Sequence, residues 1–124
     1  MNILKISLPF ITISYIEGST CNEYCGSERE IVNDNNIKEE IIKYIDQGEQ
    51  KKIECLDTTD ITNMYGLLSV LGGDERFRSF NTDLSCWDVS KVTDMGDMFY
   101  GASDFNKDLS SWDVSSVTTM AVSK

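Results

Sequence analysis

Apolar and polar positions in the C-terminal part of the chain follow a pattern that repeats. The segment from Phe80 to Met95 is written again 25 residues later as Phe105 to Met120, and the copies differ only at positions 82, 86, 91 and 94. A repeat period of about 20–50 residues is typical of proteins in which each unit buries its apolar face against its neighbours. We therefore expect a stack of repeats, with any functional surface spread over several of them.

The complete repeat, residues 80–104, contains two apolar patterns in succession. Leu84, Trp87 and Val89 have the L-x-x-L-x-L spacing that places a short strand on one face of a repeat. Apolar residues then recur every three or four positions, which favours a helical or 3₁₀ return segment; they are Val92, Met95, Met98, Phe99 and Ala102. The pattern predicts an α/β repeat, a short leucine-rich-repeat-like solenoid of 25-residue coils, with Trp87 and Trp112 stacked in its core.

Two less regular copies flank the complete repeat. A degenerate repeat covers residues 56–79, and its Met64 lies six residues farther from Met95 than the regular period predicts. The surplus falls in the loop-like cluster Gly72–Arg76. A truncated repeat covers residues 105–124 and leaves an apolar edge that a following unit would cover. Such an edge favours self-association through the open C-terminal coil.

Residues 36–55 predict an N-terminal capping helix and its connection to the first repeat. One apolar stripe is formed at positions i, i+4, i+7 and i+8 by Ile37, Ile41, Tyr44 and Ile45. Asn36 and Glu39 have the spacing of a capping box, and Gly48 is placed to end the helix. We expect this helix to cover the core of the first repeat; the alternative is a helix that is not attached to the stack.

The first twenty residues differ from the rest and have the layout of a signal peptide. Lys5 precedes an apolar run, Ile6–Ile16, which is followed by small and polar residues. The run is too short for a spanning helix, which takes about 20 residues. The alternative is an N-terminal β-strand at residues 11–16. With residues 21–35 as a polar linker, this organisation predicts a secreted or cell-surface protein.

The complete repeat has a specific sequence signature. It reads F-N-x-D-L-S-x-W-D-V-S-x-V-T-x-M and continues with Met98-Phe99-Tyr100-Gly101-Ala102. This signature resembles the repeat of BspA-like leucine-rich-repeat surface proteins. The resemblance implies a non-enzymatic, secreted or surface-displayed module for protein or cell-surface recognition and adhesion. The other hypothesis is a truncated structural or vestigial fragment of a longer repeat protein, because the last repeat stops in mid-pattern.

Charge and residue types narrow the function classes. The formal net charge is −10, which disfavours nucleic-acid binding because that normally requires a basic surface. The chain contains no His, which excludes Ser-His and Cys-His catalysis. It also lacks the P-loop, G-x-G-x-x-G and G-x-S-x-G motifs. We therefore expect that the protein is not an enzyme and has no cofactor. We expect its partner to be a protein or a surface glycan.

Polar residues of the expected strand segments form the candidate binding face. They are Ser85, Asp88, Ser90, Ser110, Asp113 and Ser115. From Phe80 onward the chain has seven Asp and no Glu, and Asp commonly hydrogen-bonds its local backbone in turns. The alternative is a ladder of stacked carboxylates that binds Ca²⁺. The loop motifs of known calcium sites are absent, so no metal site is expected.

Four cysteines, Cys21, Cys25, Cys55 and Cys86, allow three disulfide pairings in a secreted chain. Cys21 and Cys25 are the expected pair because only three residues separate them. Cys86 is then either a free thiol or paired with Cys55. A zinc site is the competing idea, but the chain offers no second close cysteine pair and no His.

Overall fold

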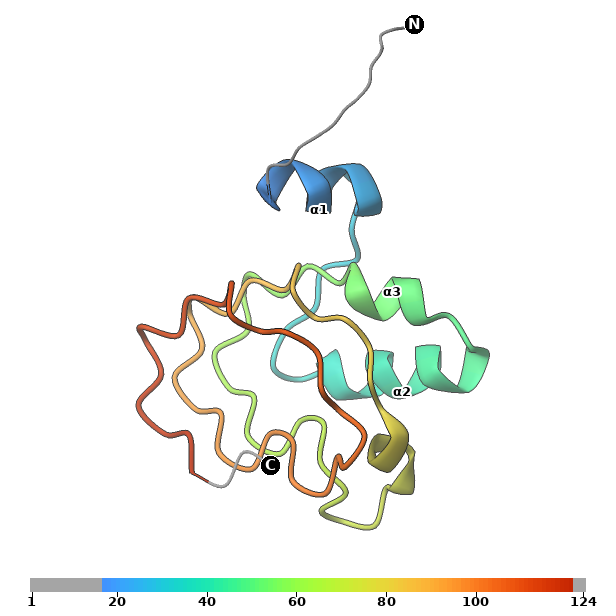
Figure 1. Cartoon of the computed structure of the whole chain (residues 1–124), viewed down its shortest axis with the longest axis vertical. Coiled ribbons are helices and arrows are strands. Elements are labelled where there is room, and N and C mark those ends of the chain that lie inside the picture. Colours follow the sequence, from blue (N-terminus) through green and yellow to red (C-terminus); the bar gives the residue numbers. More distant parts are fainter. Residues whose placement is uncertain (1–16, 122–124) are drawn as a thin grey trace, which may run out of the picture.

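A computed structural model describes residues 17–121, with side chains from Cys21 onward. Its helices are α1 (Glu17–Cys25), α2 (Ile37–Gln47), α3 (Gln50–Glu54) and the 3₁₀ helix η1 (Glu75–Ser79). Figure 1 shows α2 and α3 beside a set of nested loops, with α1 standing apart from them. The signal peptide expected at residues 1–20 lies outside the described residues except for the backbone of 17–20. Within the described part, no helix is long and apolar enough to cross a membrane.

Helix α2 forms where the apolar stripe predicts it. Ile37, Ile41 and Tyr44 are buried in the main core. Gly48 ends the helix in the left-handed conformation, with φ 71°, and its N–H donates to the carbonyl of Ile45. The expected capping box is wrong, because the Asn36 side chain makes no cap bond and instead accepts the N–H of Asn33 at 2.8 Å.

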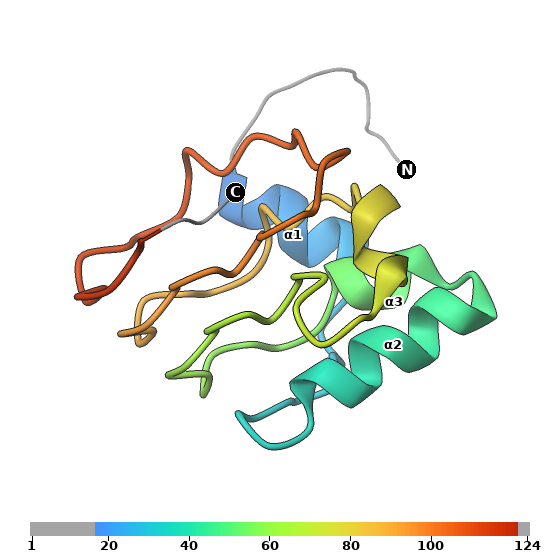
Figure 2. The same cartoon turned by 90° about the horizontal axis from the view of Figure 1, so that it is seen from below.

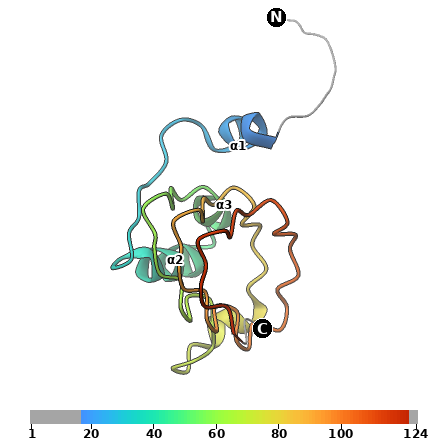
Figure 3. The ribbon, with the colours of Figure 1, turned by 90° about the vertical axis from the view of Figure 1, so that its left-hand side faces the viewer.

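Residues 56–121 form three stacked repeats: the first repeat (56–79), the second repeat (80–104) and the third repeat (105–121). The N–H of Met64 donates to the carbonyl of Asp94 at 2.8 Å, and the equivalent N–H of Met95 donates to Thr119 at 2.7 Å. The register that the sequence alignment predicts is therefore the register of the stack. Figure 2 shows the repeats one above another, with α2 beside the first, and Figure 3 shows them nested.

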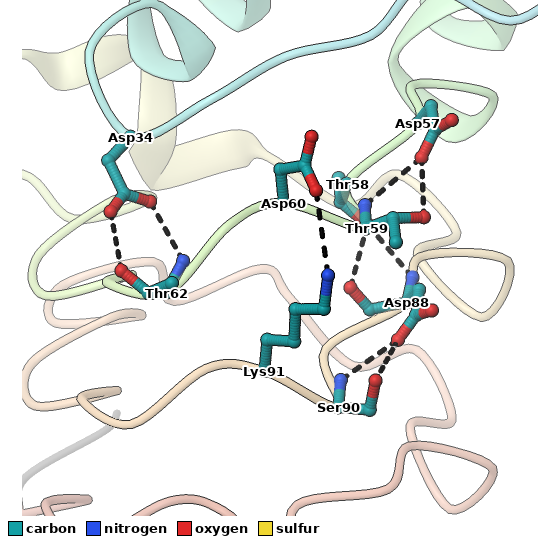
Figure 4. Close-up of polar contacts among 9 residues, drawn as sticks. All are labelled: Asp34, Asp57, Thr58, Thr59, Asp60, Thr62, Asp88, Ser90 and Lys91. Carbon is teal, nitrogen blue, oxygen red and sulfur yellow. Dashed lines mark hydrogen bonds and ion pairs between the residues drawn. The ribbon is translucent and has the colours of Figure 1, made fainter.

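Threonine forms a second ladder through the stack. The N–H and Oγ1 of Thr93 donate to the carbonyl of Thr62 at 2.8 and 3.2 Å, and those of Thr118 donate to the carbonyl of Thr93 at 2.8 and 3.1 Å. Thr62 has no preceding repeat, and the carboxylate of Asp34 takes the place of the missing carbonyl. It accepts the N–H of Thr62 at 2.8 Å and its Oγ1 at 2.6 Å (Figure 4). Asp34 therefore closes the N-terminal end of the ladder.

The expected α/β leucine-rich-repeat-like solenoid is wrong. Residues 17–121 contain no strand; pairing is limited to isolated parallel bridges, Ile31 with Asp57, Asn63 with Asp94, and Asp94 with Thr119. The expected helical or 3₁₀ return of the second repeat is a series of turns. The physical reason is local: Asp83 and Asp88 each accept the N–H of the serine two residues later. Such bonds compete with extended ladders, so the chain bends where a strand was expected.

The core positions follow the apolar pattern despite this difference. Leu84, Trp87 and Val89 are buried, as are the apolar residues of the return segment. The indole Nε1 of Trp87 donates to the carbonyl of Ile53 at 2.9 Å, and that of Trp112 donates to Leu84 at 2.9 Å. The two tryptophans therefore have equivalent environments one repeat apart, although Trp112 is only partly buried.

The segment expected as a polar linker, residues 21–35, is partly structured. It contains the end of α1, and its residue Val32 is fully buried in the core. Asp57 donates its N–H to Glu30 and accepts the N–H of Val32, which extends the parallel stack by one short segment. The stack therefore begins before the first repeat.

Candidate functional site

Two disulfides fasten α1 to the rest of the molecule. Cys21 bonds Cys86 of the second repeat, and Cys25 bonds Cys55 directly after α3, with Cα–Cα distances of 5.7 and 5.4 Å. The expected Cys21–Cys25 pair is wrong, and Cys86 is neither free nor bonded to Cys55. The reason is that residues four apart on a helix share one face. Both cysteines of α1 therefore face the stack, where each finds its own partner.

A groove of about 1060 Å³ lies between α1 and the outer surface of the second and third repeats. Helix α1 contributes Tyr24 and the Cys21–Cys86 disulfide, and Glu54 comes from the end of α3. The repeats contribute the edge of Trp87 and a set of polar side chains. The groove depends on the disulfides, because they hold one of its walls in place.

The groove contains half of the candidate binding face. Ser85, Asp88 and Ser110 line it, whereas Ser90, Asp113 and Ser115 do not. Ser90 and Ser115 instead donate their backbone N–H groups to Asp88 and Asp113 at 2.9 and 3.0 Å. These three residues hold turns of the repeats together.

The three aspartates of the groove are held by the same kind of turn. Asp83 accepts the N–H of Ser85 at 2.9 Å, and Asp108 accepts that of Ser110 at 2.9 Å. Asp88 accepts both the N–H and the Oγ of Ser90 (Figure 4). The prediction that most of these aspartates form turns is confirmed. In each case the N–H bond of the turn goes to the Oδ1 oxygen of the aspartate.

The charge of the groove is strongly negative. Its lining includes four carboxylates, Glu54, Asp83, Asp88 and Asp108, and one cation, Lys107, while Lys51 lies beside the lining residue Tyr24. Hydrogen bonds from the backbone and side chain of Ser110 hold the pKa of Asp108 below its ordinary value, so this group stays ionised well into the acid range. The groove therefore presents a fixed array of negative charge.

Tyr24 and Glu54 are site residues that the sequence pattern did not reveal. A hydrogen bond to Glu54, followed by desolvation, raises the pKa of the Tyr24 hydroxyl. The Nζ of Lys51 lies 4.6 Å from the centroid of the Tyr24 ring. The available signal was the C-x-x-x-C spacing, which on a helix places Tyr24 next to the anchored face.

The site offers negatively charged and apolar contacts to a ligand. All four cysteines are oxidised in disulfides. Over residues 17–121, no group of three or more Cys, Asp or Glu side chains is placed to hold a metal ion. The chemistry that the groove supports is recognition of a positively charged ligand.

Residues 37–122 match the family described as "Mycoplasma protein of unknown function, DUF285". No curated protein and no solved structure matches the chain. The match begins at α2 and covers all three repeats, so α1 and its two cysteines precede the segment that the family shares. The chain belongs to the DUF285 family.

Proposed function

We propose that the chain is a non-enzymatic recognition module, secreted or displayed on a cell surface, that binds a basic segment of a partner protein in the groove beside α1. The observation that carries this proposal is the groove itself, with four carboxylates against one lysine in its lining. Complementary charge across an interface steers association and selects partners. The partner therefore presents Lys or Arg side chains.

The aspartate side chains of the groove are held in place before a ligand binds, which favours binding by a preformed surface. Asp83 and Asp108 are fixed by turns, so little side-chain freedom is lost when a ligand pairs with them. The Tyr24 ring, which is 46% exposed, adds apolar surface to the groove. Aromatic side chains of this kind are enriched where proteins bind one another.

The disulfides support an extracellular location. Both cross-links join segments far apart in sequence, by 65 and 30 residues. Disulfides persist in secreted and surface proteins and are rare in reducing compartments. The resemblance of the repeat to that of BspA-like surface proteins favours the same location. Iodoacetamide treatment of the protein from its source should leave all four cysteines unlabelled; labelled thiols would contradict export.

Anionic partners are disfavoured by the same charges. A sulfated glycan or a nucleic acid would bring phosphate or sulfate groups toward Asp83, Asp88 and Asp108. Like charges in close contact oppose binding. The charge of the groove therefore favours a basic protein segment over an anionic surface glycan as the ligand.

The test uses a fluorescein-labelled peptide of alternating Arg and Gly as the probe. In the groove variant, Asp83→Asn and Asp108→Asn keep a turn-forming side chain and remove two charges. In the control variant, Asp60→Asn and Asp104→Asn remove two exposed charges outside the groove lining. Fluorescence anisotropy should show affinity falling about tenfold in the groove variant and less than about twofold in the control.

Equal losses in the two variants would show that the peptide responds only to net charge, and the proposal would fail. A further variant, with Cys21→Ser and Cys86→Ser, removes the disulfide that anchors α1 to the second repeat. It should bind the peptide more weakly at unchanged net charge. Circular dichroism confirms that each variant retains the fold.

A further inference from the structure

The outer face of the third repeat exposes apolar side chains whose counterparts are buried. Val114 is 40% exposed, whereas the equivalent Val89 of the second repeat is 2% exposed. Met120 is 46% exposed, whereas Met95 is 3% exposed. The second repeat is covered because the third packs on it. One more layer of the same kind would bury Val114 and Met120 as the third repeat buries Val89 and Met95.

Hydrogen bonding defines this layer more closely. The carbonyl of Thr93 accepts the N–H and Oγ1 of Thr118, and the N–H of Met95 donates to Thr119. At the equivalent places of the third repeat, the carbonyl of Thr118 and the N–H of Met120 have no recorded partner within residues 17–121. The Thr118 carbonyl and the Met120 N–H have the same sequence spacing as the carbonyl and N–H that bond the first repeat to the second and the second to the third.

The carbonyl of Leu109 is a third backbone group on this face, and its equivalent in the second repeat accepts a tryptophan indole N–H. The carbonyl of Leu84 accepts two hydrogen bonds. The backbone N–H of Trp87 donates to it at 3.1 Å, and the indole Nε1–H of Trp112 donates to it at 2.9 Å. The equivalent carbonyl of Leu109 accepts the backbone N–H of Trp112 at 3.0 Å, and no indole among the described residues reaches it. An occupant that brings an indole N–H to Leu109 would repeat the observed arrangement.

The opposite end of the stack does not offer the complementary surface. There the N–H and Oγ1 of Thr62 are already bonded to Asp34, and α2 buries its apolar residues in the core. A second copy of this chain cannot add its first repeat head-to-tail without losing these bonds. The occupant must therefore carry a repeat with free donor groups.

We propose that the outer face of the third repeat is a docking surface for a partner polypeptide that carries one further repeat of the pattern W-D-V-S-x-V-T-x-M. The partner's tryptophan donates its indole N–H to Leu109, its threonine donates N–H and Oγ1 to Thr118, and a backbone carbonyl accepts the N–H of Met120. Its apolar side chains cover Val114 and Met120. The docking surface adjoins the groove at Leu109, which lies between the groove residues Asp108 and Ser110, whereas Val114 and Met120 do not line the groove.

The probe is a labelled synthetic peptide that copies residues 80–104 with Cys86→Ser, because serine occupies the equivalent position 111. Fluorescence anisotropy measures its binding to the full chain. A second peptide with the additional change Trp87→Phe keeps an aromatic ring and removes the indole N–H. We expect the first peptide to bind and the second to bind several-fold more weakly.

Two protein variants make the test specific to this face. Val114→Lys places a charge on the docking surface, and Leu71→Lys places the same charge at a residue of similar exposure, 41%, in a loop of the first repeat. Val114→Lys should weaken peptide binding at least about tenfold, whereas Leu71→Lys should leave it within about twofold. Circular dichroism and thermal melts check that both variants fold as the wild type does.

The outcomes separate the occupants. No binding of the first peptide, or equal binding to the Val114→Lys variant, overturns the proposal. Sedimentation that shows wild-type dimers disrupted by Val114→Lys but unaffected by the peptide assigns the face to a second copy, which also overturns it. Neither result bears on the basic peptide in the groove, because the two sets of variants share no residue.

Discussion

The second and third repeats have nearly the same sequence and different surroundings. Both keep the tryptophan, the threonine and the turn-forming aspartates, and both bond to the preceding repeat in the same register. Yet Val89 and Met95 are buried, while Val114 and Met120 are largely exposed. The comparison shows that local geometry in this fold is set by the repeat itself, whereas burial is set by the neighbour. Matched substitutions in the two repeats therefore separate these contributions.

The largest difference is expected at the paired methionines. Met95→Ala should lower the free energy of unfolding by about 2–5 kcal/mol, because truncating a buried methionine leaves a cavity. Met120→Ala removes a side chain that is already half exposed and should cost less than about 1 kcal/mol. Urea denaturation of the two variants measures both values. Equal losses would mean that the third repeat is covered in solution.

The repetition also explains which parts of the fold the sequence could predict. Matching residues define equivalent positions, so the alignment of Met64, Met95 and Met120 predicted the register of the stack, although the first interval is six residues longer than the second. Helix α2 was predictable because its apolar stripe is regular and Gly48 ends it. The absence of strands from residues 17–121 was not predictable in this way, because the L-x-x-L-x-L spacing shows which residues face inward and not where the chain bends. The D-x-S spacing contained that information, since Asp83 and Asp88 form turns instead of an extended chain.

The candidate site was harder to predict because it depends on α1. This helix, Glu17–Cys25, has no apolar stripe from which it could be predicted, and residues 21–35 were therefore predicted to be a linker. Its position is set by bonds from Cys21 and Cys25 to residues far along the chain. Proximity in sequence suggested the wrong pair. The groove exists only in the folded molecule, so the sequence could name Ser85, Asp88 and Ser110 but not the wall that faces them.

The tryptophans provide a smaller and more specific test of the comparison. Trp87→Phe removes an indole N–H that donates to Ile53 in a buried place and should cost about 1–3 kcal/mol. Trp112→Phe removes the equivalent bond to Leu84 where the side chain is only partly buried, and should cost less. Each variant retains a single tryptophan. Trp87 should emit at shorter wavelength and resist acrylamide, whereas Trp112 should be quenched more readily; two equally quenched emissions would contradict the stacked core.

The smallest expected effect concerns the two ends of the threonine ladder. Desolvation raises the pKa of Asp34, but the hydrogen bonds from Thr62 and Asn63 outweigh it and hold that pKa below its ordinary value. A carboxylate with a lowered pKa in the folded state stabilises the protein above its unfolded pKa of about 3.9, and this contribution is lost as the pH falls through the folded value. Asp34→Ala should therefore cost about 0.5–1 kcal/mol near neutral pH, a modest value because both side chains are exposed to solvent.

The pH dependence separates this role from a general effect of charge. The stability difference between the wild type and Asp34→Ala should be full at pH 6 and should shrink below about pH 4, as the carboxylate becomes protonated. Asp60→Ala is the matched control, because Asp60 lies near the same edge and forms only an exposed ion pair with Lys91 at 3.6 Å (Figure 4). Its stability difference should be smaller. If the two variants instead lose stability in parallel, Asp34 does not replace the missing carbonyl, and the N-terminal end of the stack is closed by α2 and residues 30–32 without it.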